Sequence, residues 1–254
     1  MDLNLESKNV LIAGGSRGIG LATAKAFVKE GANVAICARN KEGVDAAVKD
    51  IQSCGDGTAI GGTVDLTDAD AYSAWIKGAA ETLGGCDIFI PMASAGGGPA
   101  SEESWKAAFE TDLMSVFRGV ETALPLLENS DAGAIVVVAT TAALEEFGGV
   151  QAYNSMKAAV INYASNLSQS LAPKNIRVNT VSPGPIYIQG GAWNWVKENI
   201  PPMYEATLAA IPMGRFGRAE EVANTILFAG SPAVPFMTGT NIVVDGGITK
   251  RVQY

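Results

Sequence analysis

The chain contains no histidine and only three cysteines among its 254 residues. Histidine is the usual proton carrier near neutral pH, so acid–base chemistry here has to use other side chains. Cys37, Cys54 and Cys86 are odd in number and lack metal-ligand spacing, which argues against both a disulfide framework and a zinc site. We therefore expect reduced thiols, mostly buried, and no bound metal.

Long apolar runs and basic clusters are also missing. No apolar stretch reaches the roughly 18 residues that a membrane-spanning helix needs, and Met1–Glu6 has neither the basic region nor the apolar run of a signal peptide. Lys and Arg number 18 against 26 Asp and Glu, a net charge of −8, with no basic patch to follow a nucleic acid backbone. We expect a cytoplasmic protein with neither a membrane nor nucleic acid among its partners.

What is present is an alternation of apolar runs with amphipathic stretches of about a dozen residues or more, which is typical of parallel strands joined by helices. With 48% hydrophobic residues and no break in composition, residues 1–254 are predicted to form one α/β domain. The pattern predicts a doubly wound parallel sheet of about seven strands with helices on both faces. The predicted strands are Asn9–Ala13, Asn33–Ala38, Thr58–Val64, Asp87–Met92, Ala134–Ala139, Arg177–Val181 and Asn241–Val244.

Three glycines separate the first predicted strand from a helical stretch at Gly18–Glu30, in the order Gly14-x-x-x-Gly18-x-Gly20. Small residues let the backbone approach a pyrophosphate, and a helix N-terminus offers N–H groups and a positive dipole. The alternative is that the glycines only turn a strand into a closely packed helix. The residues of this loop that we expect to bind a dinucleotide are Gly14, Ser16, Arg17, Gly18, Ile19 and Gly20.

The end of the second strand indicates which dinucleotide is bound. NAD-binding folds usually place an Asp or Glu there, but Ile36–Lys41 contains no carboxylate. Arg39, helped by Arg17, can instead bind a 2′-phosphate, so NADP(H) is favoured over NAD(H), unless both are ordinary surface arginines. Asp65, after the third strand, is expected to contact the adenine beside Leu66, with a cap for the helical stretch from Asp68 as the competing role.

Tyr153 and Lys157 are four residues apart, which puts a phenol and an ammonium on one face of a helix. A nearby cation favours phenolate and lowers the pKa of a tyrosine from its usual value of about 10 toward neutrality. Such a tyrosine can exchange a proton with a carbonyl or hydroxyl group. The alternative is an amphipathic helix in which the tyrosine packs and the lysine is solvated.

Taken together, these motifs resemble the short-chain dehydrogenase/reductase family, a family with a Rossmann-type fold. The resemblance covers about Lys8 to Ile248. In chain order the motifs are Gly14-x-x-x-Gly18-x-Gly20, Tyr153-x-x-x-Lys157, Arg177-Val178-Asn179, Pro183-Gly184 and Thr238-Gly239 followed by Val243-Val244-Asp245-Gly246-Gly247.

The resemblance implies a role for each matching residue. Tyr153 would exchange the proton at the reacting oxygen, while Lys157 would lower its pKa and hydrogen-bond the nicotinamide ribose. Thr140 stands where the family has a substrate-orienting serine, with Thr141 as the alternative hydroxyl, and Ile186 matches the position whose backbone holds the nicotinamide carboxamide. The remaining residues implied to bind the cofactor are Ala93, Tyr153, Pro183 and Gly184.

One departure concerns the proton relay. Asp112 stands where the family usually has an asparagine that supports the relay water; an ionised aspartate accepts hydrogen bonds but donates none. It would keep Lys157 charged if the two are close, so we expect an altered pH optimum rather than loss of activity. The alternative is a surface aspartate on a helix that does not match the family's.

The reaction implied is hydride transfer between NADP(H) and a carbonyl or secondary alcohol. Trp193 and Trp195 lie in the segment 186–212, which we expect to form a lid over an apolar, possibly cyclic, substrate. A buried cluster or a subunit contact would explain the same aromatic residues equally well.

Two other functions stay open at this point. Reduction of a 3-oxoacyl group on an acyl carrier protein is disfavoured because the stretch 126–131 is acidic where an acidic partner would prefer basic residues. A non-catalytic NADP-binding regulator or scaffold is the alternative of another class. The long helical stretches Trp105–Leu127 and Ala152–Ala172 carry more apolar positions than one stripe needs, and family members pair such helices into tetramers; we expect a homotetramer.

Overall fold

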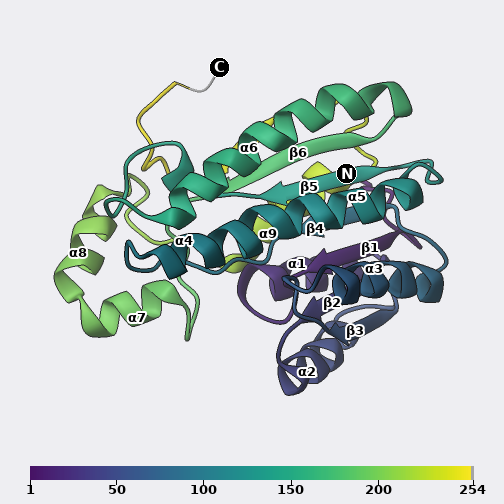
Figure 1. Ribbon diagram of the computed structural model, residues 1–254, viewed down its shortest axis with the longest axis horizontal. Helices are drawn as coiled ribbons and strands as arrows, with labels where there is room; N and C mark the ends of the chain where they lie inside the picture. Colours follow the sequence, from purple (N-terminus) through teal and green to yellow (C-terminus); the bar gives the residue numbers. More distant parts are fainter. Residues whose placement is uncertain (253–254) are drawn as a thin grey trace.

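A computed structural model describes residues 1–252. Its centre is a seven-stranded sheet in the order β3-β2-β1-β4-β5-β6-β7, and every neighbouring pair is parallel (Figure 1). The predicted doubly wound α/β fold is therefore confirmed. The strands are β1 (Asn9–Ala13), β2 (Asn33–Ala38), β3 (Ala59–Thr63), β4 (Ile88–Pro91), β5 (Ala134–Val138), β6 (Arg177–Pro183) and β7 (Asn241–Val244).

Helices cover both faces of the sheet because alternate residues of each strand point to opposite sides. In β1, Val10 and Ile12 belong to one buried cluster, and Leu11 and Ala13 belong to the other. The first cluster is closed by α1 (Gly18–Lys29), α2 (Lys41–Gln52) and α9 (Ala219–Gly230). The second is closed by α3 (Ala69–Leu83), α5 (Ser115–Leu127) and α6 (Ala152–Leu171).

The remaining helices lie near the carboxyl ends of the strands. They are α4 (Glu102–Ala108), α7 (Ala192–Asn199) and α8 (Pro201–Ala210), and α7 and α8 extend beyond the end of the sheet, away from the layers on its faces (Figure 1). Strand β1 pairs with β2 on one side and β4 on the other. The strand order therefore reverses at β1, the point where open α/β sheets bind ligands.

The predicted bounds hold fully for β1, β2 and β7, and differ by up to two residues for the others. The largest difference is β6, which continues through Pro183 because Ser182 and Pro183 still pair with Val243 and Val244 of β7. The predicted helical stretch from Trp105 to Leu127 is not one regular helix. Its backbone widens into a π-helical turn at Phe109–Met114 between α4 and α5. Across residues 1–252, no helix combines the length and the apolar character needed to cross a bilayer.

Candidate active site

The glycine loop joins β1 to α1 and needs its glycines for steric reasons. Gly14 has a φ of +101°, and a Cβ there would lie 2.9 Å from the backbone nitrogen of Ala93, which follows β4. A Cβ on Gly20 would lie 2.1 Å from the carbonyl oxygen of Gly14. These contacts hold the loop tightly against the first turn of α1 and the end of β4.

The N-terminus of α1 is well suited to an anion. Arg17 precedes the helix without a side-chain cap, and the first turn contains no acidic residue. Its N–H groups and the positive end of its dipole are therefore free for a phosphate. Ser16 is half-buried beside them, while the side chain of Ile19 packs on the core below.

Arg17 and Arg39 are both exposed at this edge, and within residues 1–252 neither forms a salt bridge. The pKa of the nearby Asp65 carboxyl is lowered, first by hydrogen bonds from Thr67 and to a smaller extent by the charge of Arg39. The proposed capping role of Asp65 is wrong, because Asp68 caps α3 by accepting a bond from Ala71 N. The Leu66 side chain is buried in the core, so only its backbone can face a cofactor.

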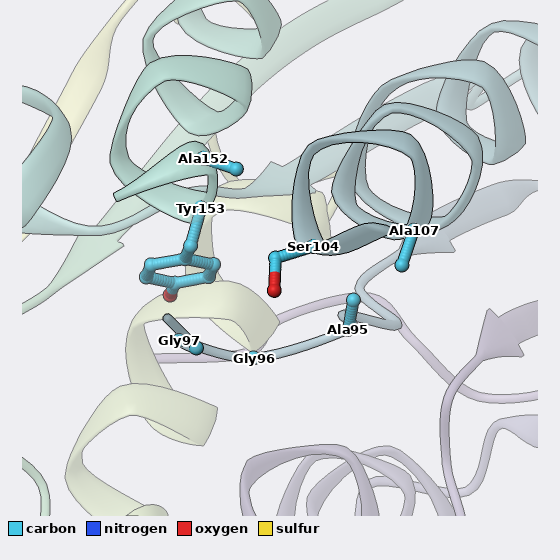
Figure 2. Close-up of a pocket in the computed structure, with 8 residues that line it drawn as sticks. Ala95, Gly96, Gly97, Ser104, Ala107, Ala152 and Tyr153 are labelled. Atoms are coloured by element: carbon cyan, nitrogen blue, oxygen red, sulfur yellow. The ribbon is translucent and has the colours of Figure 1, made fainter. Parts of the chain in front are cut away.

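Tyr153 lies in the first turn of α6 and faces a small cavity of about 100 Å³ (Figure 2). The walls of the cavity come from the loop after β4, from α4 and from α6. They are formed by Ala95, Gly96, Gly97, Gly98, Ser104, Ala107, Ala152 and Tyr153. Ser104, whose hydroxyl points toward this space in Figure 2, was not predicted from the sequence.

The side chain beside Tyr153 is that of Thr140 and not that of Thr141. Burial raises the pKa of Tyr153 to about 12, and a hydrogen bond with the Thr140 side chain opposes that rise. Thr140 Oγ1 also accepts a bond from Ala142 N, which fixes the hydroxyl at the end of β5. Thr141 is buried in the short 3₁₀ turn Thr141–Ala143.

Lys157 is buried one turn further along α6, and its ammonium is bound by groups other than Tyr153. Its Nζ donates to the carbonyl oxygen of Val138 at 3.0 Å and lies 3.4 Å from Asp112 Oδ1. Burial lowers the pKa of Lys157, and the carboxylate of Asp112 opposes this effect. The expectation that Lys157 lowers the pKa of Tyr153 is wrong for this arrangement, because burial dominates and the charge of Asp112 raises that pKa further.

Asp112 lies in the π-helical turn and is fully buried, so the alternative of a surface aspartate is wrong. Its Oδ2 accepts a hydrogen bond from the backbone N–H of Ala95, at the start of the cavity loop. Such π-helical turns frequently mark functional sites, because they turn one side chain out of the regular helical register.

The segment after β6 approaches the glycine loop from the other side. Gly184 N donates to the carbonyl of Val244, and a Cβ on Gly184 would lie 2.5 Å from Asp245 Cβ. Ile186 forms a parallel bridge with Gly217, and its side chain is buried. Ile188 lies over Gly18, where its Cδ1 would be 3.2 Å from an added Cβ.

Aromatic side chains connect the segment 186–212 to the rest of the protein. Phe216, just before α9, packs against Tyr204 and Trp193 with ring centroids 4.6 and 5.0 Å apart. Trp193 also meets Phe147, which comes from the loop after β5. Trp195 is 56% exposed and lies outside this cluster, so only one of the two tryptophans packs here.

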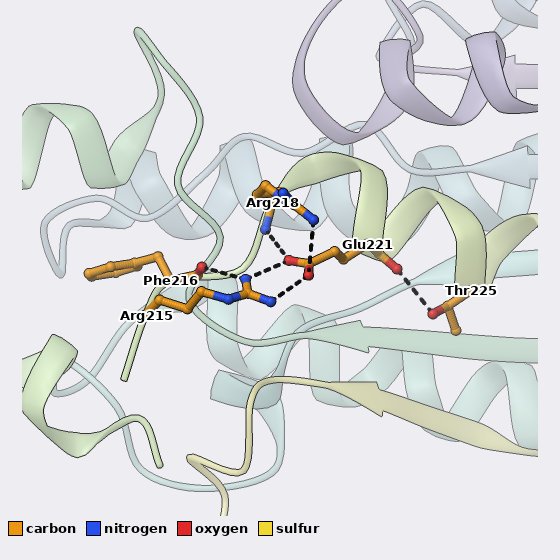
Figure 3. Close-up of polar contacts among 5 residues, drawn as sticks. All are labelled: Arg215, Phe216, Arg218, Glu221 and Thr225. Carbon is orange, nitrogen blue, oxygen red and sulfur yellow. Dashed lines mark hydrogen bonds and ion pairs between the residues drawn. The ribbon is translucent and has the colours of Figure 1, made fainter. Parts of the chain in front are cut away.

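A salt bridge fixes the backbone on which Phe216 stands (Figure 3). Arg215 donates to both carboxylate oxygens of Glu221, and Glu221 Oε2 also accepts from the backbone N–H of Arg218. These bonds lower the pKa of the Glu221 carboxyl to about 2. Phe147 and Phe216 were not predicted from the sequence, because isolated aromatic residues far apart in the chain give no sign that they share a cluster.

The acidic stretch 126–131 does not lie at the mouth of the site. Glu128 pairs with Lys174, and Asp131 pairs with Lys8, the residue directly before β1. These residues therefore lie at the amino edge of the sheet, whereas Tyr153 and the glycine loop lie at the carboxyl edge. The argument drawn from this stretch against a carrier-protein partner is wrong.

Comparison with known proteins agrees with this geometry. A family profile described as "Enoyl-(Acyl carrier protein) reductase" matches residues 13–249. Isoepoxydon dehydrogenase of Aspergillus clavatus is 37% identical over 99% of this chain and 98% of its own length. The 2,5-dichloro-2,5-cyclohexadiene-1,4-diol dehydrogenase of Sphingobium indicum is 31% identical over 96% of each chain.

Among solved structures, L-sorbose reductase from Gluconobacter frateurii complexed with NADPH and L-sorbose superposes with a TM-score of 0.90. It is 27% identical to this chain and covers 99% of this chain and 100% of its own. With a glycine loop, a Tyr153–Lys157 pair and relatives that align from end to end, the chain belongs to the short-chain dehydrogenase/reductase family of oxidoreductases.

Proposed function

We propose that this protein is an NADP(H)-dependent oxidoreductase that interconverts a carbonyl compound and the corresponding secondary alcohol, with Tyr153 as general acid and base. The observation that carries the proposal is the position of Tyr153, which faces a cavity with the Thr140 side chain beside it. A bound nicotinamide would supply or accept the hydride. Because its pKa is raised to about 12, Tyr153 holds its proton at neutral pH and is suited to donate it to a carbonyl oxygen.

Support for NADP(H) over NAD(H) comes from the end of β2. Arg39 follows that strand in a stretch, Ile36–Lys41, that contains no carboxylate, and Arg17 stands at the uncapped N-terminus of α1. Two arginines without salt bridges among residues 1–252 fit a 2′-phosphate, which guanidinium groups bind with paired hydrogen bonds. A solved neighbour of high structural similarity is complexed with NADPH.

We propose an apolar substrate, with cyclic compounds included in that class. The segment 186–212 would act as its lid. Trp193 would line the side of this lid that faces the loop after β5, because its ring packs against Phe147 from that loop. The name of one relative specifies a chlorinated cyclohexadiene diol as substrate, a ring of this type. Trp195 would have a smaller role, because its side chain faces solvent.

The second candidate is reduction of a 3-oxoacyl group on an acyl carrier protein. The description of the matching family profile favours it, and the acidic stretch that argued against it lies at the opposite edge of the sheet. For either substrate we propose a cytoplasmic homotetramer. A non-catalytic regulator is less well supported, because Tyr153 lines the cavity, the Thr140 side chain lies beside it, and Lys157 is buried one turn further along α6.

The proposal is tested by following cofactor oxidation with aliphatic, cyclic and aromatic ketones and with a 3-oxoacyl carrier thioester, using NADPH and NADH in parallel. We expect turnover of free ketones with NADPH preferred. In Arg39→Ala the KM for NADPH should rise about 10- to 100-fold, as expected for loss of a charged hydrogen bond, while the KM for NADH stays the same. Cofactor binding without turnover of any substrate would support the regulator instead.

A further inference from the structure

The cavity beside Tyr153 offers very few side-chain groups that can form hydrogen bonds. Its lining residues are glycines and alanines, apart from Ser104 and Tyr153. Among these residues, a side-chain hydrogen bond to a ligand has to come from one of the two hydroxyl groups. Both hydroxyl groups are directed toward the stretch Gly96–Gly97 that bounds the cavity (Figure 2). Ser104 is therefore the second polar contact point of the site.

The start of α4 fixes the place of Ser104. Ser101 caps this helix, because its Oγ accepts a hydrogen bond from the backbone N–H of Ser104 at 3.2 Å. Ser101 Oγ also donates to Ser104 Oγ at 3.3 Å. This second bond occupies an acceptor position of the Ser104 hydroxyl and leaves its proton for a ligand.

Room for a ligand beside Ser104 comes from Gly98 on the opposite wall. A Cβ at that position would lie 3.4 Å from Ser104 Oγ, so even a methyl group would touch the hydroxyl. Gly98 is not among the glycines with a positive φ, so its backbone conformation does not require glycine. The missing side chain at this position keeps the Ser104 hydroxyl open to the cavity.

The size of the cavity limits what it can hold. Its volume is about 100 Å³, and an engineered protein cavity of about 150 Å³ binds benzene. The space therefore matches one small ring, which can reach outward along the exposed loop Gly96–Gly98. A ring in this position lies between Tyr153 on α6 and Ser104 on α4.

We propose that Ser104 hydrogen-bonds a second oxygen of the substrate, which is a ring ketone that also carries a hydroxyl or another carbonyl group. This inference rests on the proposed function, because Tyr153 has to bind the reacting oxygen. In the reduction, hydride from NADPH forms the new bond to the carbonyl carbon, and the electron pair of the C=O π bond takes the proton of Tyr153. The second oxygen keeps all its bonds, so Ser104 determines specificity and transfers no proton.

A hydroxyl group in a cavity wall discriminates between substrates by the bond that it gains or loses. A second oxygen on the ring accepts the Ser104 proton, whereas a plain ketone displaces water from Ser104 and leaves the hydroxyl without a partner. Ser104 is half-buried, so the difference should be that of one neutral hydrogen bond, about three- to tenfold. The apolar part of the ring remains for the aromatic side chains of the segment 186–212.

The test compares kcat/KM with NADPH for cyclohexanone and for the three isomers of hydroxycyclohexanone, in the unaltered protein and in Ser104→Ala. The quantity measured is the ratio of the best hydroxyketone to cyclohexanone, because a general loss of folding or of cofactor binding cancels in this ratio. We expect the ratio to fall about three- to tenfold in Ser104→Ala. An equal loss on all four ketones would overturn the proposal.

Ser155→Ala is the matched control. Ser155 is exposed on α6, two residues after Tyr153, and does not line the cavity. The ratio should be the same in this variant as in the unaltered protein. Gly98→Ala tests the same space with the Ser104 hydroxyl still present: its methyl group lies against Ser104 Oγ, so the ratio should fall here as well. If Ser104→Ala does not fold, an unchanged ratio in Gly98→Ala contradicts the proposal.

A 3-oxoacyl thioester completes the set of substrates, because its second carbonyl is also an acceptor for Ser104. A loss of activity in Ser104→Ala that is confined to this thioester would overturn the ring as the substrate. Turnover of the ketones with a ratio that does not depend on Ser104 would overturn this inference alone. A protein that turns over none of these compounds would instead overturn the proposed function.

Discussion

At the scale of single residues, the site depends on how its buried groups pair: Lys157 Nζ lies 3.4 Å from Asp112 Oδ1 and donates to the carbonyl oxygen of Val138. The Tyr153–Lys157 spacing and Thr140 led directly to groups that the structure brings together. The pairing of Lys157 with Asp112 and Val138 was not predictable, because it depends on a π-helical turn whose register no periodicity indicates. The sign of the Tyr153 pKa shift was wrong for the same reason: spacing does not report burial.

The glycine loop gives a residue-scale prediction for stability. Gly20→Ala should lower the free energy of unfolding by about 2 kcal/mol, because the new methyl group overlaps the Gly14 carbonyl and forces the backbone to move. Urea unfolding measures this, and NADPH affinity should fall as well.

Gly78→Ala is the control for that variant. Gly78 lies in α3 with no atom within 4 Å of an added Cβ. There the change should raise the free energy of unfolding by about 0.5–1 kcal/mol, because alanine favours the helix. Equal effects at the two positions would show that steric contact at Gly20 is not important.

At the scale of elements, β1, β2 and β7 were predicted to the residue because each is a short apolar run with clear ends. The segment 186–212, which we propose as a lid, was predicted only as a range of residues. Its attachment depends on Phe147 and Phe216, which are about 70 residues apart in the sequence and meet through Trp193. The Arg215–Glu221 salt bridge holds Phe216 in place (Figure 3). The pairing of these two residues also depends on the fold.

This salt bridge should be insensitive to pH in the neutral range. Glu221 has a pKa lowered to about 2, so the stability it adds is present above the usual glutamate value of about 4.5 and is lost only as pH falls toward 2. Changes in activity between neutral and alkaline pH therefore come from the active site and not from the lid attachment.

Trp193→Ala tests the lid directly. Loss of its contacts with Phe147 and Phe216 should raise the KM for the carbonyl substrate about five- to tenfold, equivalent to about 1 kcal/mol, while the KM for NADPH changes little. Trp195→Ala, on the same helix but exposed, should leave both values unchanged. Steady-state kinetics of both variants distinguish a lid from a surface helix, and identical effects would contradict the assignment.

At the scale of the whole molecule, the doubly wound parallel sheet and the edge that carries the site followed from the alternation of strands and helices. The one error at this scale was the acidic stretch 126–131, whose distance from the site depends on which edge of the sheet it occupies. The salt bridges of Asp131 with Lys8 and of Glu128 with Lys174 place the stretch at the amino edge, and these salt bridges form only in the folded chain.

The assembly is also a prediction at this scale. Phe109 and Phe117 are each more than 40% exposed on the side formed by the π-helical turn and α5. Covering such residues in a symmetric contact would stabilise an oligomer. Light scattering at micromolar concentration should give the mass of four chains, and a monomeric mass would contradict the homotetramer.

The central claim is that Tyr153 transfers the proton while the cofactor transfers hydride. Tyr153→Phe removes only the phenolic oxygen from the cavity (Figure 2). We predict that single-turnover oxidation of bound NADPH by a ketone substrate slows by about 10²- to 10⁴-fold, with NADPH affinity within about twofold of the unaltered protein, because the glycine loop and Arg39 are unchanged. A single-turnover rate that is unchanged in Tyr153→Phe would contradict the account.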